Sequence, residues 1–276
     1  MYRLRFNTIS QLFDVPGDTQ VVLPAEDLFK EIKNGPSKEV SKLLSEKRIL
    51  AEIPSVLWEG SVQRTKEILI ALKEAGVSNV LCENIGGFNI CSELGLSIHG
   101  GMYLNVMNTS SIEQYKALGA VDLTLSFEMP FAKQRALLSR KQAFLDKANG
   151  KEQDTKDGTV MDQPLAMIIY GYLPLMKFRA CPAMGKNGCK GCTRDKELVD
   201  RKGERFRILC HDSRYSELLN CVPLYVADKG LPKLDIYTLY FTVESKEECE
   251  KIFDMVSRSA EPSFRRTAGL YNRELL

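Results

Sequence analysis

The order of apolar and amphipathic segments is the feature that most limits how this chain can fold. Up to residue 173, short apolar runs rich in β-branched residues alternate with helical patterns. We expect strands at 2–8, 19–25, 48–56, 79–85, 96–106, 121–128 and 164–173, and helices at 61–76, 111–119 and 132–148. Strands and helices that alternate over short connections predict a parallel sheet wrapped by helices, and seven such units favour a TIM-like α/β barrel over a doubly wound sheet. Because we count seven strands rather than eight, an incomplete barrel stays open as an alternative.

The pattern changes after residue 175. Residues 150–163 are polar and aperiodic, which predicts a surface loop before the last barrel strand. Further on, strands are expected at 205–209, 223–228 and 235–244, followed by a helix at 245–257. The sequence therefore predicts two domains, a β/α barrel at 1–175 and a small Cys-rich α+β appendage at 176–276 that covers the C-terminal mouth of the barrel.

The chain has the composition of an ordinary soluble protein, with 44% apolar and 27% charged residues. Its first ten residues, "MYRLRFNTIS", do not show the basic and then apolar regions of a secretory signal. No stretch approaches the roughly 18 apolar residues that cross a bilayer. We therefore expect a cytoplasmic protein without membrane association, in which clustered cysteines indicate metal or redox chemistry more often than disulfides.

Four of the eight cysteines lie in one segment, at Cys181, Cys189, Cys192 and Cys210. Zinc sites mostly use two closely spaced pairs, and only the second and third of these cysteines are spaced in that way. An iron–sulfur cluster tolerates wider and uneven spacing. The pattern thus favours a 4Fe-4S cluster, with a zinc site or a metal-free thiol loop as alternatives.

The other four cysteines have plainer interpretations. Cys82, Cys91 and Cys249 fall in apolar patterns and are predicted to be small core residues. Cys221 is kept as a reserve ligand.

Positive charge is concentrated around the cysteines. Residues 176–210 contain ten basic and four acidic side chains, a balance of +6 in a chain whose net charge is +2. Such a segment suits a polyanion such as RNA or a small carboxylate substrate, and a merely solvated loop is the alternative. No RRM, zinc-finger or helix-turn-helix pattern accompanies it.

Polar residues at the ends of the expected strands are candidates for chemistry, because catalytic groups of barrels come from the C-terminal ends of strands. They are Glu83, Asn84, His99, Asn105, Asn108, Glu128, Tyr170 and Tyr172. For any one of them, the alternative is a structural hydrogen bond that braces a turn. With two histidines and neither a G-x-S-x-G nor an H-E-x-x-H motif, the sequence offers no protease nucleophile or zinc-protease site.

Several segments together resemble the collagenase-like peptidase family U32. They are "LSIHGGMYLNVMNTSSIEQYKALGAVDLTLSFEM", "YGYLPLMKFRACPAMGKNGCKGC", "LVDRKGERFRILC", "ELLNCVPLYVAD" and "LYFTVES". The resemblance runs from about residue 50 onward and is strongest to the C-terminal unit of long, two-unit members. The family's opening "APAG" strand and "GADAVY" motif are absent, which suggests a unit that works with a separately encoded full-length relative through an open barrel edge.

The resemblance implies a specific chemistry. Relatives of this family are oxygen-independent hydroxylases of tRNA, ribosomal RNA or a ubiquinone precursor, with prephenate as hydroxyl donor and a 4Fe-4S cluster on four cysteines. Carried onto this chain, it implies cluster ligands at Cys181, Cys189, Cys192 and Cys210, with the "LLNS" serine of most relatives replaced by Cys221. Asn105, Glu128 and His99 are then the catalytic candidates. The candidates for holding substrate are Asn84, Tyr170, Arg179, Arg201 and Lys202. A noncatalytic partner subunit and a collagenase-like protease are the alternative functions.

Overall fold

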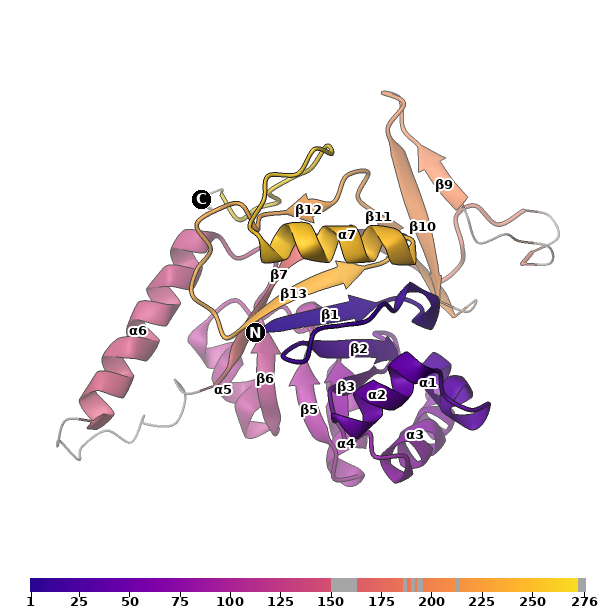
Figure 1. Ribbon diagram of the computed structural model, residues 1–276, viewed down its shortest axis with the longest axis horizontal. Coiled ribbons are helices and arrows are strands. Elements are labelled where there is room, and N and C mark those ends of the chain that lie inside the picture. Colours follow the sequence, from indigo (N-terminus) through magenta and orange to yellow (C-terminus); the bar gives the residue numbers. More distant parts are fainter. Residues whose placement is uncertain (150–162, 186–187, 190–191, 193–195, 212–213, 273–276) are drawn as a thin grey trace.

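Eight parallel strands close into a barrel in the computed structural model, which describes residues 1–149, 163–185, 188–189, 192, 196–211 and 214–272 (Figure 1). The barrel strands are β1 (Tyr2–Phe6), β2 (Gln20–Pro24), β3 (Ile49–Glu52), β4 (Asn79–Cys82), β5 (Ser97–Gly100), β6 (Ala120–Thr124), β7 (Leu165–Gly171) and β13 (Ile236–Phe241). Neighbours pair in chain order from β1 to β7, and β13 then pairs with both β7 and β1. This confirms the predicted TIM-like α/β barrel.

The barrel is complete, and its eighth strand lies outside the predicted barrel domain. Residues 236–241 form β13, a strand that the sequence analysis placed in the appendage, and Tyr237 pairs with Tyr2 of β1. The division expected at residue 175 therefore does not hold for this strand. An open barrel edge for a partner protein was also expected, and closure between β13 and β1 removes it.

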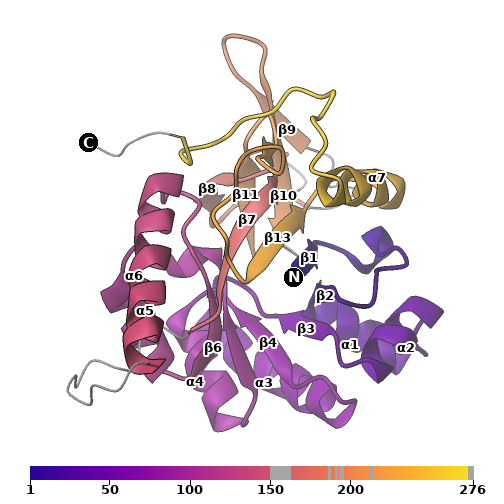
Figure 2. The ribbon, with the colours of Figure 1, turned by 60° about the vertical axis from the view of Figure 1, so that its left-hand side comes forward.

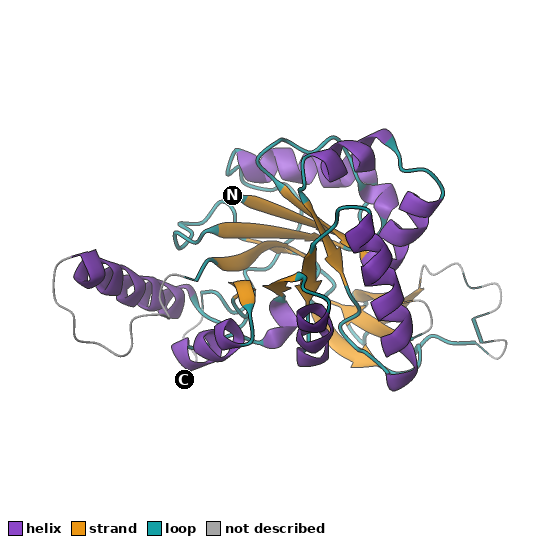
Figure 3. Ribbon diagram, turned by 90° about the horizontal axis from the view of Figure 1, so that it is seen from below, coloured by secondary structure: helices purple, strands orange, loops and turns teal. Residues whose placement is uncertain are grey.

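Helices surround the barrel, as Figure 3 shows from below. They are α1 (Ala25–Lys33), α2 (Lys38–Ser45), α3 (Glu59–Glu74), α4 (Ile85–Glu93), α5 (Thr109–Ala117), α6 (Phe131–Asn149) and α7 (Lys246–Ser257), with short 3-10 turns η1 (Ile9–Gln11) and η2 (Met102–Leu104). The helices α3, α5, α6 and α7 match the predicted ranges within two residues at each end. The far end of α6 projects away from the barrel, and the predicted loop at 150–163 lies outside the described residues apart from Gln163 (Figure 1).

A small antiparallel sheet covers the C-terminal end of the barrel (Figure 2). It contains β8 (Pro174–Phe178), β9 (Lys196–Val199), β10 (Arg205–His211) and β11 (Tyr215–Leu219) in the order β8-β11-β10-β9. We call it the cap sheet. A further two-residue strand, β12 (Leu224–Tyr225), pairs antiparallel with the C-terminal end of β7. The cap sheet is the part of the predicted Cys-rich appendage that forms a separate sheet, and β12, β13 and α7 do not belong to it.

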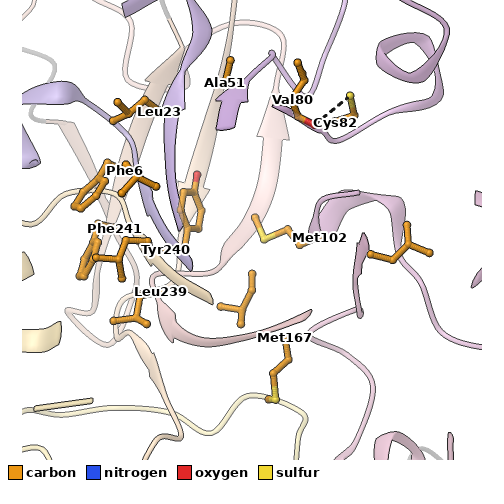
Figure 4. Close-up of a cluster of buried hydrophobic side chains, with 14 of the residues drawn as sticks. Phe6, Leu23, Ala51, Val80, Cys82, Met102, Met167, Leu239, Tyr240 and Phe241 are labelled. Carbon is orange, nitrogen blue, oxygen red and sulfur yellow. Dashed lines mark hydrogen bonds between the residues drawn. The ribbon is translucent and has the colours of Figure 1, made fainter. Parts of the chain in front are cut away.

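Apolar side chains fill the space between the barrel and its helices. Phe6 of β1 and Phe241 of β13 stack with their ring centroids 5.3 Å apart (Figure 4). Both are fully buried, and each contributes about 2–3 kcal/mol of hydrophobic stabilisation. The predicted core residues Cys82, Cys91 and Cys249 are each 0% exposed, as expected. In the described part of the chain, no helix is both long and apolar enough to cross a membrane.

Candidate functional site

The inside of the barrel holds charged residues in two layers. In the lower layer, near the N-terminal ends of the strands, the Arg3 guanidinium donates to both oxygens of Asp122, at 2.6 and 3.2 Å. His99 Nδ1 lies 2.6 Å from the same carboxylate, and its Nε2 lies 3.1 Å from Asn79 Oδ1. Burial acts to raise the pKa of Asp122, but the Arg3 charge and the His99 hydrogen bond outweigh it and lower this pKa to about 2.

One of the predicted catalytic residues, His99, belongs to this lower layer. His99 is 6% exposed and has both ring nitrogens within hydrogen-bond distance of partners inside the barrel, away from the mouth. Groups at the N-terminal end of a barrel generally serve stability, and catalytic groups lie at the opposite end. The position of His99 is therefore that of a residue that stabilises the barrel.

The upper layer lies at the C-terminal ends of the strands and is centred on Arg5. Its guanidinium donates two hydrogen bonds to the Glu52 carboxylate, at 2.5 and 2.7 Å. Arg5 Nη1 also lies 2.8 Å from Glu83 Oε1, and the guanidinium carbon lies 4.1 Å from the centre of the Tyr240 ring. One buried cation thus holds two carboxylates at the barrel mouth.

Glu83 is the more deeply buried of these two carboxylates, with a side chain 0% exposed. Its Oε2 accepts a 2.8 Å hydrogen bond from the Tyr103 amide, whereas Oε1 touches Arg5 outside hydrogen-bond geometry. Burial raises the pKa of Glu83 despite the Arg5 charge. Gly101 makes this close packing feasible, because a Cβ there would lie 2.2 Å from the Glu83 carboxyl carbon.

The cap sheet adds a third carboxylate above this layer. Glu217 of β11 accepts a 2.6 Å hydrogen bond from the Tyr103 hydroxyl and lies 3.1 Å from His211 Nε2. Although burial acts to raise the pKa of Glu217, the His211 hydrogen bond and the Lys177 charge lower it to about 2. The Glu217 carboxylate thus fixes the orientation of the His211 ring at the cleft.

Lys177 of β8 lies between the cap sheet and the barrel. Its Nζ is 2.6 Å from Ser55 Oγ, 3.2 Å from Glu217 Oε1 and 3.3 Å from the centre of the Tyr103 ring. Burial lowers the pKa of Lys177 by more than the Glu217 carboxylate raises it. The amine is 31% exposed, so it remains accessible from solvent.

A cleft of about 130 Å³ opens between the barrel mouth and the end of the cap sheet. Its lining includes Glu52 of β3 and Asn7, which follows β1, together with Cys210, His211 and Tyr215 from the cap sheet. A carboxylate, an imidazole and a phenol therefore border one opening at the end of the barrel where barrel proteins bind substrates. This cleft is the candidate functional site.

The pairing of the cap strands places Cys210 beside Ser216 at the end of the sheet that borders the cleft. Phe178, the last residue of β8, pairs with Ser216, which pairs on its other side with Cys210. Because Cys181 follows β8 by three residues, it lies near this row. β9 starts at Lys196 beside Ile208, and Cys189 and Cys192 precede it in the sequence.

The thiols do not, however, form a ligand set as described. Cys189 and Cys192 are exposed, and Cys181 and Cys210 are partly buried. Among the described residues, no three His, Cys, Asp or Glu side chains are arranged so that they could hold a metal ion. Residues 186–187, 190–191 and 193–195, between and after these cysteines, are outside the described part, and the iron–sulfur cluster stays a prediction.

Two further catalytic candidates are not brought to the cleft. Asn105 is exposed at the end of η2, where it adopts a left-handed φ of 52°. The expected strand at 96–106 stops at Gly100 instead. Glu128 is also exposed, in the turn after β6, and its amide donates to Ser126 Oγ at 3.2 Å.

The substrate-binding candidates are spread over the C-terminal end of the barrel and the cap sheet. Asn84 caps α4 and donates to the carbonyls of Pro54 and Ser55, each at 3.2 Å, so it braces the loop that carries Ser55. Arg179 lies 5.1 Å from the Trp58 ring.

The remaining three lie away from this loop. Tyr170 is buried and donates a 2.6 Å hydrogen bond to Glu244 Oε1. Arg201 and Lys202 are exposed in the turn between β9 and β10.

Sequence reasoning missed most of the residues that border the cleft. They include Glu52, His211 and Tyr215. Sequence reasoning also missed the residues that contact this lining or one another next to it, which are Arg5, Ser55, Tyr103, Lys177 and Glu217. One signal was available for Arg5 and Glu52: a charge inside an apolar strand whose faces are both covered must be paired inside the barrel.

Comparison with known proteins finds similar chains among solved structures. The sequence matches no known family model and no curated protein. Among solved structures, the U32 peptidase Mk0906 is 11% identical, with a TM-score of 0.45 over 88% of this chain and 93% of that one. The CutC protein of Streptococcus agalactiae, described in connection with copper homeostasis, is 17% identical, with a TM-score of 0.37 over 61% of this chain and 87% of that one.

Proposed function

We propose that this chain is a U32-type iron–sulfur protein that takes part in oxygen-independent hydroxylation of RNA, with prephenate as the hydroxyl donor. One observation carries the proposal. Cys210, one of the four candidate ligands Cys181, Cys189, Cys192 and Cys210, lines the barrel-mouth cleft. A cluster on these thiols would therefore adjoin the place where a barrel binds its substrate.

The chain's own side chains have distinct roles in this proposal. His211, held by Glu217, takes or gives a proton at the cleft, and Glu52, fixed by Arg5, orients a hydroxyl or amine of the substrate. The exposed Arg201 contacts phosphate groups outside the cleft. The cluster, held by the four cysteines, would transfer electrons in the reaction or bind the donor. The cytoplasm, where thiols stay reduced, is the compartment that this chemistry requires.

The metal content of the protein tests the first half of the proposal. Protein purified without oxygen should contain about four irons and four sulfides and absorb broadly in the visible range. Cys189→Ser should lose the iron and the absorbance, whereas Cys249→Ser, in the buried core, should keep both. Zinc without colour, or no metal at all, would refute the cluster.

The RNA of a strain that lacks the protein tests the second half. Nucleoside mass spectrometry of its tRNA and ribosomal RNA should show the loss of a hydroxylated nucleoside. The wild-type gene should restore it, and a His211→Gln gene should restore it poorly. Unchanged nucleoside profiles would contradict RNA as the substrate even if the cluster is present.

A second function, peptide or ester hydrolysis, is favoured by the contact between Ser55 and Lys177. The 2.6 Å distance from Ser55 Oγ to Lys177 Nζ is that of a serine nucleophile and a lysine base, and burial lowers the pKa of the lysine. Glu217 orients the amine. In such a reaction Lys177 takes the Ser55 proton as the serine oxygen attacks the substrate carbonyl. The lysine then returns the proton to the amine or alcohol, which leaves as an ester forms on Ser55, and water later hydrolyses that ester to release the acid.

A serine-reactive fluorophosphonate tests this function. It should label Ser55, and labelling should increase with pH as Lys177 loses its proton below the ordinary lysine pKa of 10.5. Ser55→Ala should abolish labelling, and Ser45→Ala, an exposed serine on α2, should not change it. If Ser55→Ala is labelled as strongly as wild type, the serine is not a nucleophile.

A further inference from the structure

A second cavity lies on the other side of the barrel's C-terminal end. It has a volume of about 420 Å³ and lies among the ends of β7 and β13, the helix α7 and residues 263–265. Its apolar lining includes Tyr172, Ile252, Met255 and Phe264. Cavities of this size with apolar and aromatic walls are typical of small-molecule sites. None of these residues borders the barrel-mouth cleft.

The carboxylates of this cavity already have partners. Glu244 accepts a hydrogen bond from the Tyr170 hydroxyl at 2.6 Å and others from the amides of Thr242 and Val243, at 2.6 and 2.9 Å. Glu248 accepts from the Ser245 amide at 2.8 Å. Neither acid is therefore available to bind a cationic ligand without losing bonds that shape the loop before α7.

The cations of the cavity are less committed. Arg265 pairs with Glu204 at 2.8 Å. Within the described part of the chain, Arg207 and Lys251 form neither a hydrogen bond nor an ion pair with another side chain. Burial and the Glu244 charge raise the pKa of Tyr172, and the Arg207 charge acts in the opposite direction. A guanidinium and an amine thus border an apolar cavity whose own acids are occupied.

We propose that this cavity binds a small anion with a flat apolar body, with its acidic group on Arg207 and Lys251 and its ring beside Tyr172 and Phe264. Charge-assisted hydrogen bonds from arginine to a carboxylate or phosphate are the strong ones, and aromatic walls favour a planar partner. The site does not depend on the proposed hydroxylation, because it needs no cluster and shares no residue with the cleft.

The acidic group is bound by side chains rather than by the backbone. Barrel proteins often hold phosphate on amides of the loops after their seventh and eighth strands, which here are β7 and β13. In this chain the Glu244 carboxylate occupies the amides of Thr242 and Val243 that follow β13. The anion therefore has to be held by Arg207 and Lys251.

A calorimetric titration of the protein with 2-naphthoate tests the proposal. It should bind saturably, and the neutral 2-naphthamide should bind at least about tenfold more weakly. Titration with 2-naphthyl phosphate identifies the acidic group, since the tighter of the two acids shows whether a carboxylate or a phosphate fits better. No saturable binding of either acid up to about 5 mM would overturn the proposal.

Two substitutions two residues apart on one strand locate the ligand. Arg207→Gln should weaken binding about tenfold, whereas Arg205→Gln, whose guanidinium pairs with Glu197 outside the cavity, should bind as wild type does. Met255→Trp, which fills the cavity, should abolish binding while the thermal transition is retained. Equal affinity of the acid and the amide, or equal losses in the two arginine variants, would each refute the assigned site.

Discussion

Replacing Asp122 by asparagine should destabilise the barrel by removing the carboxylate that neutralises Arg3. The Arg3 and Asp122 side chains are 1% and 5% exposed, and their contact measures 2.6 Å. Asparagine keeps the shape but leaves the guanidinium charge buried without an anion, a loss that commonly costs about 3–5 kcal/mol. We expect the free energy of unfolding to fall by that amount at pH 7.

The pH dependence of the unfolding free energy gives a second estimate of what the Asp122 carboxylate contributes. The pKa of Asp122 is about 2 in the folded protein and 3.8 ordinarily, so the carboxylate favours the folded state above pH 4, and this contribution is lost as the pH falls toward 2. The difference of 1.8 pKa units corresponds to about 2 kcal/mol at pH 7. Roughly 1 kcal/mol of it should disappear between pH 5 and pH 3.

Urea unfolding followed by circular dichroism measures both effects. The gap in unfolding free energy between wild type and Asp122→Asn should narrow by about 1 kcal/mol from pH 5 to pH 3. Asp14→Asn, which breaks a pair between an 81% exposed carboxylate and Lys42, should change stability little at either pH. If Asp122→Asn is no worse than Asp14→Asn, or if the gap does not change with pH, the ion pair does not support the barrel.

Three further changes test other parts of the fold. Gly101→Ala should cost about 1–3 kcal/mol by thermal unfolding because its Cβ meets the Glu83 carboxylate, whereas Gly60→Ala, with nothing within 4 Å, should stay within about 1 kcal/mol of wild type. Glu217→Gln should cost about 3 kcal/mol at pH 7, and less near pH 3, because its pKa of about 2 lies below the ordinary 4.5. Leu239→Ala should cost about 2–5 kcal/mol in one cooperative transition, and a separate early transition would contradict the place of β13 in the barrel.

Periodicity predicted the barrel and its long helices but not the eighth strand. β13 follows β7 only after the cap sheet and β12, so the alternation of strand and helix is interrupted just where the barrel closes. Strands this far apart in sequence pair because the backbone N–H and C=O groups at both open edges of the sheet require hydrogen-bond partners. No local sequence pattern indicates such a pairing. The helix α4 was missed for a related reason: its two glycines disfavour a helix, yet a Cβ at Gly87 would lie 2.5 Å from Ile53, so close packing requires glycine there.

Of the polar residues that the sequence analysis expects at the C-terminal ends of the strands, Glu83 belongs to the charged layer around Arg5. The sequence placed polar groups at the C-terminal strand ends, and the structure has Glu52 and Glu83 there. The alternation in "YRLRF" resembles a strand with one face in water, whereas Arg3 and Arg5 are 1% and 3% exposed inside the barrel. Only the acids contributed by other strands make those positions tolerable for arginine, and those contacts are not local in sequence.

Contacts between the barrel and the cap sheet explain why the sequence did not predict the residues around the cleft. Tyr103, from the barrel, donates its hydroxyl to Glu217 of the cap sheet, and its ring lies beneath the Lys177 amine. Tyr103 also donates its amide to Glu83, so one residue joins the buried barrel acid to the cap acid. A change at either carboxylate should therefore shift the position of the other through Tyr103, and the cap sheet acts as a structural part of the barrel mouth rather than as a separate appendage.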